Sequence, residues 1–311
     1  MGLNTYTDIR NLPPADSRVV IINCGTKWVT SLAVLSAHRH AKLPIVLIDC
    51  ESKDGSKEHF NRIAKESNID VDWVAWPLRP HPVALDQLFK QIPAENVLLM
   101  DSDLEICSPN LIEQMSETLH RNSNAYASGF LHGPAWLGKE HGLPAYTGYY
   151  AERMWIPLVY MKTGPIRAAL KQGFSFLNRR PYYELPSAPR LSRVLGLRHR
   201  IVGLKHVPFP KVGRDRPMYD GRFPKFVEFD TGADLHAQLL RNGFAFEALP
   251  INLWGDVVHH HGVTRAHLAK GVRRIAKQLR LISRATETDQ ATVLDDVLRR
   301  LAVGYGVGAP K

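Results

Sequence analysis

Short runs of apolar residues recur along the first hundred positions of the chain at a nearly constant interval. Four of these runs are rich in β-branched residues and almost continuously apolar, as is typical of strands buried on both faces of a sheet; they span 18–23, 44–49, 71–76 and 96–100. Stretches with helical patterns lie between them, at 28–41, 57–67 and 83–91. This alternation predicts an α/β fold in which a mostly parallel sheet is flanked by helices.

The pattern is less regular after residue 120. Apolar runs at 125–131 and 155–161 are compatible with strands, and residues 164–173 predict a short helix with proline in its first turn and glycine after its end. Residues 178–225 are rich in proline and basic residues and lack periodicity, so we expect a long surface excursion or lid there. A helix is expected at 231–242, where Gly243 is the stop signal.

The C-terminal tail is expected to be helical from residue 265. Its apolar residues recur at helical spacing and form one stripe: Leu268, Val272, Ile275, Leu279 and Ile282. Residues 265–284 include seven Lys or Arg and no acidic residue. A basic amphipathic helix of this kind either lies on an anionic membrane surface or packs its stripe on the main domain.

The overall charge of the chain points to an anionic partner. The 311 residues carry a formal net charge of +10, which is compatible with nucleic acid, an anionic membrane surface or a phosphorylated substrate. The sequence has no helix-turn-helix, zinc-finger or base-stacking signature, and we therefore expect no nucleic-acid partner.

The cysteines and the N-terminus indicate a compartment. Cys24, Cys50 and Cys107 form no CxxC motif and no disulfide framework, so we expect buried thiols in a reducing environment. The N-terminal residues lack the apolar region of a secretory signal, and no apolar run is long enough to span a bilayer. A cytoplasmic location follows as the expectation, with peripheral membrane contact through the basic tail.

The strongest local signal is an acidic turn. The apolar strand at 96–100 runs directly into Asp101 and Asp103, which are separated by Ser102. Ligands of parallel sheets bind beyond the carboxyl ends of the strands, and hard divalent cations that neutralise diphosphates bind carboxylate oxygens. The segment is therefore a candidate metal and diphosphate site; the alternative is a turn or a helix cap, because Asp favours both.

A second signal follows the strand at 44–49. This strand ends in Asp49, where a carboxylate can accept hydrogen bonds from a base or a ribose. The polar loop that follows contains Asp54-Gly55, which is typical of a turn, and Ser56, which is typical of a helix N-cap.

A third signal is the histidine run His259-His260-His261, which ends an apolar strand. His259 and His261 would share one face of that strand, and histidine suits Mn²⁺ and other borderline ions. The alternatives are a phosphate-binding pocket rim and a polar turn.

Together these segments resemble nucleotide-sugar glycosyltransferases of the GT-A fold, particularly the family 2 group. The resemblance covers roughly residues 17–110 and rests on VVIINCGTKWVTSLAVLSA, DCESKDGS and LLMDSD. It implies that Asp49 contacts the nucleotide base, that Asp101 contacts the ribose and the metal shell, and that Asp103 binds Mn²⁺ or Mg²⁺. Ser102 is counted with Asp49 and Asp101 among the donor-binding residues. A C-terminal histidine is a further metal ligand in some members, which makes His261 and then His259 the candidates.

The resemblance also implies a general base near the start of a later helix. The best match is EFDTGADL at 228–235, whose register departs from the usual Glu-Asp-x-Asp-Leu pattern. We assign the base to Asp230, which is also a candidate helix cap, and keep Asp234 and Glu228 as alternatives.

The activity implied is metal-dependent, inverting transfer of a sugar from a UDP- or GDP-linked donor to a hydroxyl of a carbohydrate or lipid-linked acceptor. We expect a glycosyltransferase domain at 1–263, with a nucleotide-binding half at 17–110, an acceptor and metal half at 111–263, and a helical tail at 264–311. The alternatives are a nucleotidyltransferase of related fold, for which the glycine loop at 23–27 is a poor match, and a noncatalytic nucleotide-sugar-binding or nucleic-acid-binding protein.

Overall fold

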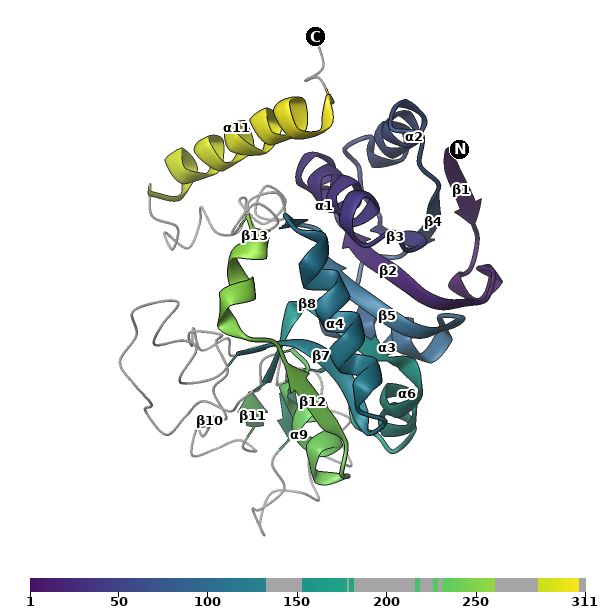
Figure 1. Ribbon diagram of the computed structural model, residues 1–311, viewed down its shortest axis with the longest axis vertical. Helices are drawn as coiled ribbons and strands as arrows, with labels where there is room; N and C mark the ends of the chain where they lie inside the picture. The colour runs from purple at the N-terminus through teal and green to yellow at the C-terminus, as the bar shows by residue number, and fades with distance from the viewer. Residues whose placement is uncertain are drawn as a thin grey trace, which may run out of the picture.

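The centre of the molecule is an eight-stranded sheet with the strand order β1-β4-β3-β2-β5-β8-β7-β12 (Figure 1). The structure is a computed structural model, and it describes residues 1–132, 153–177, 179–181, 216–218, 226–228, 231–260 and 285–307. In this sheet β8 runs antiparallel to both of its neighbours, and every other pair of adjacent strands is parallel. The predicted α/β fold with a mostly parallel sheet flanked by helices is therefore confirmed.

The first half of the chain follows the predicted alternation closely. Its strands are β1 (Leu3–Tyr6), β2 (Ala15–Asn23), β3 (Ile45–Cys50), β4 (Val71–Trp76) and β5 (Ala94–Asp101). Its helices are α1 (Lys27–His40), α2 (Ser56–Glu66) and α3 (His81–Gln91), together with the short 3₁₀ helix η1 (Ile9–Asn11). The edge strand β1, which has four residues and pairs with β4, was not predicted from the sequence.

The second half completes the sheet. It contributes α4 (Pro109–Arg121), β7 (Ala125–His132), β8 (Arg153–Lys162), α6 (Thr163–Lys171), α9 (Ala233–Arg241), β12 (Ala245–Ala248) and the 3₁₀ helix η2 (Ile251–Asp256). Two small sheets lie outside the main one: β9 (Arg179–Pro181), β10 (Arg216–Met218) and β11 (Phe226–Glu228) form the first, and β6 (Leu104–Ile106) and β13 (Val257–His259) form the second. Only the backbone of β9, β10 and β11 is described.

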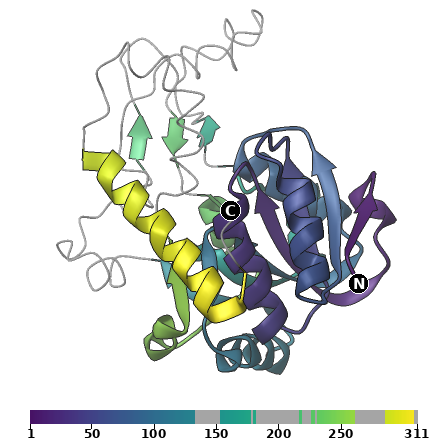
Figure 2. The same cartoon turned by 90° about the horizontal axis from the view of Figure 1, so that it is seen from above.

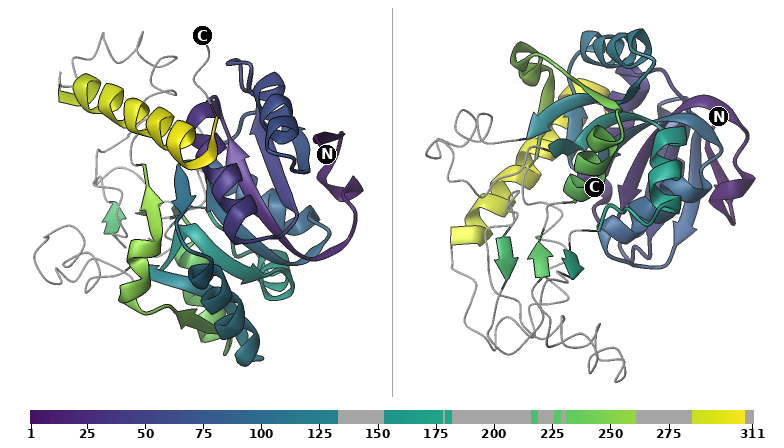
Figure 3. Two further views of the ribbon diagram at one scale, coloured as in Figure 1. Left: turned by 45° about the horizontal axis from the view of Figure 1, so that its top comes forward. Right: turned by 90° about the horizontal axis from the view of Figure 1, so that it is seen from below.

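Apolar side chains from alternate strand positions divide between two layers. In β2, Val19 and Ile21 belong to one buried cluster, which also contains side chains of α1, α2, α4 and the C-terminal helix α11 (Ala285–Tyr305). Val20 belongs to a second cluster, with side chains of α3, α6 and α9. The sheet is thus covered on both faces, which explains why its strands read as continuous apolar runs. Figures 2 and 3 show α11 lying beside α1.

The parallel register brings polar residues from several strands to one edge of the sheet. Asn23 pairs with Asp49 across β2 and β3, and Ile22 pairs with Asp101 across β2 and β5. These positions are the carboxyl ends of their strands, where ligands of open α/β sheets bind.

Some expectations lie beyond the described residues. They include most of the basic excursion at 178–225 and the amphipathic stripe at 268–282. The helix described in the tail is α11, which follows that stripe in the chain. None of the helices in the described part of the chain is long and apolar enough to cross a membrane. The prediction of buried cysteines is confirmed for Cys50, whereas Cys24 is half-buried and Cys107, which follows the end of β6, is exposed.

Candidate metal centre

The acidic turn lies where β5 ends and β6 begins. Asp101 is the last residue of β5, and the turn through Ser102 and Asp103 carries the chain into β6. Ser102 is buried, and the side chain of Asp103 is 10% exposed, against 27% for Asp101. The turn therefore presents one half-buried and one buried carboxylate at the carboxyl edge of the sheet.

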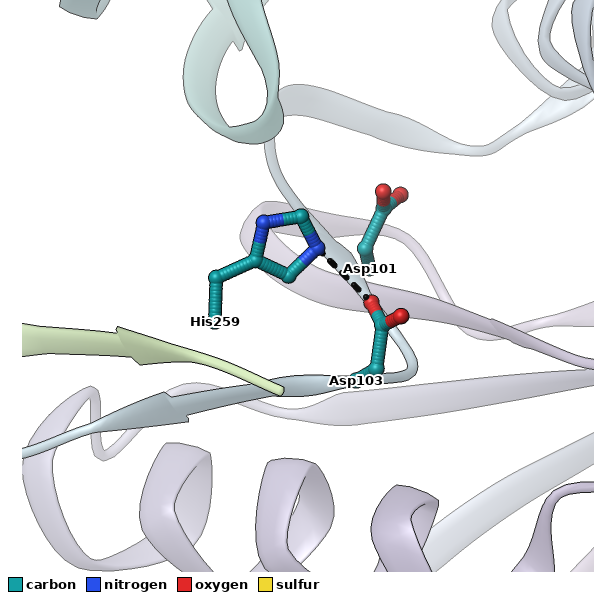
Figure 4. Close-up of side chains that lie close together, drawn as sticks. All are labelled: Asp101, Asp103 and His259. Atoms are coloured by element: carbon teal, nitrogen blue, oxygen red, sulfur yellow. Dashed lines mark hydrogen bonds and ion pairs between the residues drawn. The ribbon is translucent and has the colours of Figure 1, made fainter. Parts of the chain in front are cut away.

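The strand β13 delivers a histidine to this turn. It pairs antiparallel with β6, so that His259 lies opposite Leu104, and the N–H of His260 donates to the carbonyl of Asp103 at 2.8 Å. The Nε2 atom of His259 lies 3.2 Å from Oδ1 of Asp103. Figure 4 shows this imidazole and the carboxylates of Asp101 and Asp103 converging on one place from different elements.

The three side chains form a donor set that fits a divalent cation. One ligand atom from each of Asp101, Asp103 and His259 can be chosen so that all three lie within 4.8 Å of one another. Two carboxylate oxygens and an imidazole nitrogen are compatible with Mn²⁺, and the carboxylates also suit Mg²⁺. Burial raises the pKa of Asp101, His81 opposes that rise, and the Asp103 carboxylate adds to it. A cation bound here would relieve the repulsion between the two carboxylates.

His81 lies next to this centre and was not predicted from the sequence. Its Nε2 atom lies 3.9 Å from Oδ1 of Asp101, and its side chain is 39% exposed. The residue opens α3 after the loop that follows β4. A signal was present in the sequence, because the loop after a parallel strand emerges at the same edge as the other ligand-binding loops.

An aromatic cluster supports the imidazole of His259. The ring of Trp155, on β8, meets the His259 ring edge-on with 5.7 Å between the centroids. Trp155 in turn packs against Trp254 and Phe130, at 4.4 Å and 6.0 Å. These contacts restrict the rotamers of His259 and hold its Nε2 atom toward Asp103.

The predicted base-contacting residue, Asp49, is engaged in a network inside the protein. It is 6% exposed, and its Oδ1 atom accepts a hydrogen bond from Nδ2 of Asn23 at 2.7 Å. The hydroxyl of Ser52 also donates to Oδ1, and the Ser52 N–H donates to Oδ2 at 3.1 Å. Nδ2 of Asn23 lies 3.0 Å from the hydroxyl oxygens of both Ser52 and Ser56. Asp49 thus organises the loop between β3 and α2, and its contact with a base stays a prediction.

The loop between β2 and α1 is tied to the same network through its backbone. The amide N–H of Gly25 donates to the Ser52 hydroxyl at 2.7 Å, that of Thr26 to Oδ1 of Asn23 at 3.3 Å, and that of Lys27 to Oδ2 of Asp54 at 3.3 Å. Three successive amides therefore bond to side chains of the protein itself.

The turn at Asp54-Gly55 forms as expected. Gly55 has a φ of 76°, in the left-handed region that favours glycine, and precedes the first residue of α2. The Asp54 carboxylate accepts hydrogen bonds from the N–H and the hydroxyl of Ser56, at 3.1 Å and 2.5 Å. The N-cap of α2 is therefore Gly55, and Ser56, the predicted cap, is the first residue of the helix.

A second ionic cluster, formed by Glu105, His260 and Arg300, lies next to the metal centre. It was not predicted from the sequence. Glu105, on β6, is 7% exposed and lies within reach of His260 and of Arg300 on α11. Burial alone would raise the pKa of Glu105, but the nearby His260 imidazole and the charge of Arg300 outweigh it and lower that pKa.

The candidates for the general base are placed only in part. Asp230 and the metal-ligand candidate His261 lie outside the described residues. Glu228 ends β11, where only the backbone is described. Asp234 is buried in the first turn of α9, two residues after Gly232, which has a φ of 79°.

No protein-family model and no curated protein matches the sequence. Among solved structures, the chain is similar to a mannosyltransferase from Pyrobaculum calidifontis in complex with GDP-Man and Mn²⁺, at 13% identity over 97% of this chain and 78% of that one, with a TM-score of 0.45. It is also similar to glucosyl-3-phosphoglycerate synthase from Mycobacterium tuberculosis in complex with Mn²⁺ and UDP, at 14% identity over 48% of this chain and 57% of that one, with a TM-score of 0.34.

A third similar structure has a different activity. It is 4-diphosphocytidyl-2C-methyl-D-erythritol synthase from Anaerococcus prevotii, at 13% identity over 50% of this chain and 74% of that one, with a TM-score of 0.38. Glycosyltransferases are thus among the structures that this chain is similar to, as the sequence resemblance predicts. At these TM-scores the likeness identifies no activity, and the assignment has to come from the site itself.

Proposed function

We propose that the protein is a metal-dependent glycosyltransferase that uses a nucleotide-diphosphate sugar as its donor. The observation that carries this proposal is the convergence of Asp101, Asp103 and His259 at the carboxyl edge of the sheet. A divalent cation can neutralise the charge of a diphosphate donor, and these three side chains supply the oxygen and nitrogen ligands for one.

Each residue has a proposed role in the reaction. Asp103 and His259 hold Mn²⁺ or Mg²⁺, and His261 is the alternative imidazole. Asp101 orients the donor ribose and shares the cation, with Ser102 between the two carboxylates. A cation held by these side chains would neutralise the negative charge that develops on the departing nucleoside diphosphate. Asp49 contacts the nucleotide base.

Asp230 is the proposed general base, with Asp234 and Glu228 as alternatives. It precedes α9 in the chain and removes the proton from the acceptor hydroxyl as that oxygen attacks the sugar. Attack opposite the leaving diphosphate inverts the anomeric configuration. A carbohydrate or lipid-linked acceptor is compatible with the net charge of +10, which favours an anionic ligand. A cytoplasmic location with peripheral membrane contact belongs to the same proposal.

The loop after β2 argues against nucleotidyl transfer at this site. Such an enzyme needs free backbone amides in its glycine loop, together with a basic side chain, to bind a triphosphate. Here the amides of Gly25, Thr26 and Lys27 already bond to Ser52, Asn23 and Asp54, and the Lys27 ammonium bonds to the Asp54 carbonyl. The backbone amides of this loop are thus already bonded to residues of the protein.

The test is calorimetric titration of the full chain with Mn²⁺ and with UDP, GDP and their sugar conjugates, in the presence of Mn²⁺ and then of EDTA. We expect micromolar nucleotide binding that EDTA abolishes. Asp103→Asn should weaken Mn²⁺ binding by at least 100-fold. Glu117→Gln, which removes a carboxylate that is 61% exposed on α4, is the matched control and should leave binding unchanged.

The outcomes separate the candidate functions. Metal-dependent binding of one nucleotide sugar, followed by transfer to an acceptor, supports the proposal. Binding of a nucleoside triphosphate with release of pyrophosphate would replace it by nucleotidyl transfer. Donor binding without turnover on any acceptor would favour a sensor, and absence of nucleotide binding under every metal condition would overturn the proposal.

A further inference from the structure

The two metal ligands outside β5 are held by a very small sheet. Asp103 directly precedes β6 and His259 ends β13, and each of these strands has three residues. The distance between the two side chains depends on the register that places His259 opposite Leu104. An isolated two-stranded sheet is marginally stable, so this register needs support from the surrounding structure.

Glu105 provides a connection from this small sheet to the C-terminal helix. Its Oε2 atom accepts a hydrogen bond from Nη1 of Arg300 at 3.0 Å, and its Oε1 atom accepts one from the Tyr305 hydroxyl at 3.2 Å. Nε2 of His260 lies 3.5 Å from the same Oε2 atom. A carboxylate that is 9% exposed is costly to bury unless it is paired, so these contacts hold β6, the end of β13 and α11 together.

The C-terminal helix is itself firmly docked. Val297 and Leu301 are buried in the core cluster that contains α1. Nη2 of Arg39, on α1, donates to the carbonyl of Gly304 at 2.6 Å, and its guanidinium lies 4.2 Å from the centre of the Tyr305 ring. The side chains that reach Glu105 therefore project from a fixed surface.

We propose that α11 is a clamp for the metal centre, in which Arg300 and Tyr305 act through Glu105 to hold Asp103 and His259 at the spacing that a divalent cation requires. Glu105, Arg300 and Tyr305 are positioning residues in this scheme, since none of them belongs to the candidate ligand set. The proposal rests on the proposed function, because it assumes that the three candidate ligands bind a cation.

The sign of the expected effect distinguishes positioning from simple electrostatics. Arg300 is a positive charge near a cation site, so its removal should strengthen Mn²⁺ binding if only long-range charge matters. If Arg300 positions the ligands through Glu105, its removal should weaken binding, because groups that orient metal ligands typically contribute 10- to 100-fold in affinity.

The chain offers a closely matched control for this experiment. Arg299 and Arg300 both bond to Asp296, at 2.5 Å and 2.8 Å, and both carry the same charge on the same helix. Arg300 bonds to Glu105, whereas the Arg299 side chain is 71% exposed. Arg299→Met therefore removes the charge without removing the clamp.

We would titrate the full chain with Mn²⁺ alone, by calorimetry and by electron paramagnetic resonance of the free ion, in the wild type, Arg300→Met, Arg300→Lys and Arg299→Met. Arg300→Met should bind Mn²⁺ about 10-fold more weakly, Arg300→Lys should recover part of that loss, and Arg299→Met should match the wild type. Tyr305→Phe is a milder variant that removes one hydrogen bond, with an expected loss of about threefold, and it replaces Arg300→Met if that variant does not fold.

The results for the wild type and the variants separate the two proposals. If the wild type binds Mn²⁺ and Arg300→Met binds it equally well or more tightly, the clamp is overturned and the proposed function stands. An equal loss in Arg299→Met would also overturn the clamp. If the wild type binds neither Mn²⁺ nor a nucleotide, the metal centre itself is wrong, and the clamp falls with it.

Discussion

At the ends of β2 and β3, the polar side chains around Asn23 and Asp49 form hydrogen bonds within the protein, whereas at the end of β5 two carboxylates lie close to one imidazole. The amide of Asn23 bonds to Asp49 at one end and to Thr26 and Thr30 at the other. Burial raises the pKa of Asp101. The charge of His81 lowers that pKa in part, and the charge of Asp103 raises it further. Both clusters lie at the same edge of the sheet, and both read as polar strand ends in the sequence. The comparison teaches that two polar strand ends can look alike in the sequence and differ in the structure: one carboxylate is enclosed in hydrogen bonds to amides and hydroxyls, and the other shares its place with a second carboxylate and an imidazole.

The largest effect should come from breaking the Asn23 cluster. Asn23→Ala removes the donor to the buried Asp49 carboxylate and the acceptor for two threonine hydroxyls. We expect the free energy of unfolding to fall by about 3 kcal/mol, because several buried polar groups lose their partners at once. Urea denaturation measures this change. Asn110→Ala, at an exposed position on α4, should change it by less than about 0.5 kcal/mol, and a similarly small loss in Asn23→Ala would contradict the comparison.

A divalent cation bound to Asp101, Asp103 and His259 should stabilise the folded protein. Mn²⁺ at a concentration 100-fold above its Kd should raise the free energy of unfolding by about 2.7 kcal/mol, since the ion binds the folded chain alone. Thermal unfolding with Mn²⁺ and then with excess EDTA would measure the shift. Asp103→Asn should remove it, whereas Ser52→Ala, in the Asn23 cluster, should retain it. A shift that persists in Asp103→Asn would place the bound ion elsewhere.

Acid should lower the stability of the protein through the buried imidazole of His59. Burial, and to a lesser extent the charge of Arg62, lowers the pKa of His59 to about 4. Because this folded-state pKa lies below the unfolded value, the unfolded chain takes up the proton first as the pH falls. Stability is therefore lost between roughly pH 6.5 and pH 4, by about 1 kcal/mol between pH 7 and 5.5.

Urea denaturation at several pH values would measure this loss. His59→Gln should reduce the slope of the free energy of unfolding against pH. His236, whose pKa burial also lowers to about 4, should supply a similar contribution that persists in that variant. The slope of Asn110→Ala, at an exposed position on α4, should equal that of the wild type. An unchanged slope in His59→Gln would show that this histidine titrates normally.

The smallest expected effect is a gain in stability, in the variant Asp101→Asn. Asp101→Asn removes a carboxylate whose charged form is disfavoured in the folded protein, so the metal-free protein should gain about 0.5 kcal/mol of stability. The measurement is urea denaturation in EDTA, with Asp70→Asn as an exposed control. A loss of stability in Asp101→Asn would mean that its contact with His81 outweighs the repulsion from Asp103.

Much of the fold could be predicted because the strands of the sheet are buried on both faces. The apolar runs around Val20, Leu47, Val74 and Leu98 predicted four strands in the order observed. The three-residue strand β6 could not be found in this way, since a run of that length carries no periodicity. The strand β13 was expected, because the apolar residues before the histidine run predict a strand that ends there. His259 was a candidate ligand for this reason and because the family resemblance implies a C-terminal histidine ligand.

The sequence by itself determined the layers, the parallel sheet and the acidic turn, because each depends on residues close together in the chain. Only the tertiary structure decided which polar groups meet. Arg300 reaches Glu105 across 195 positions, and His259 reaches Asp103 across 156. Such contacts depend on strand register and helix docking, which are set by packing over the whole core. The physical reason is that periodicity encodes which face of an element is buried, while the partners on that face are chosen by the fold.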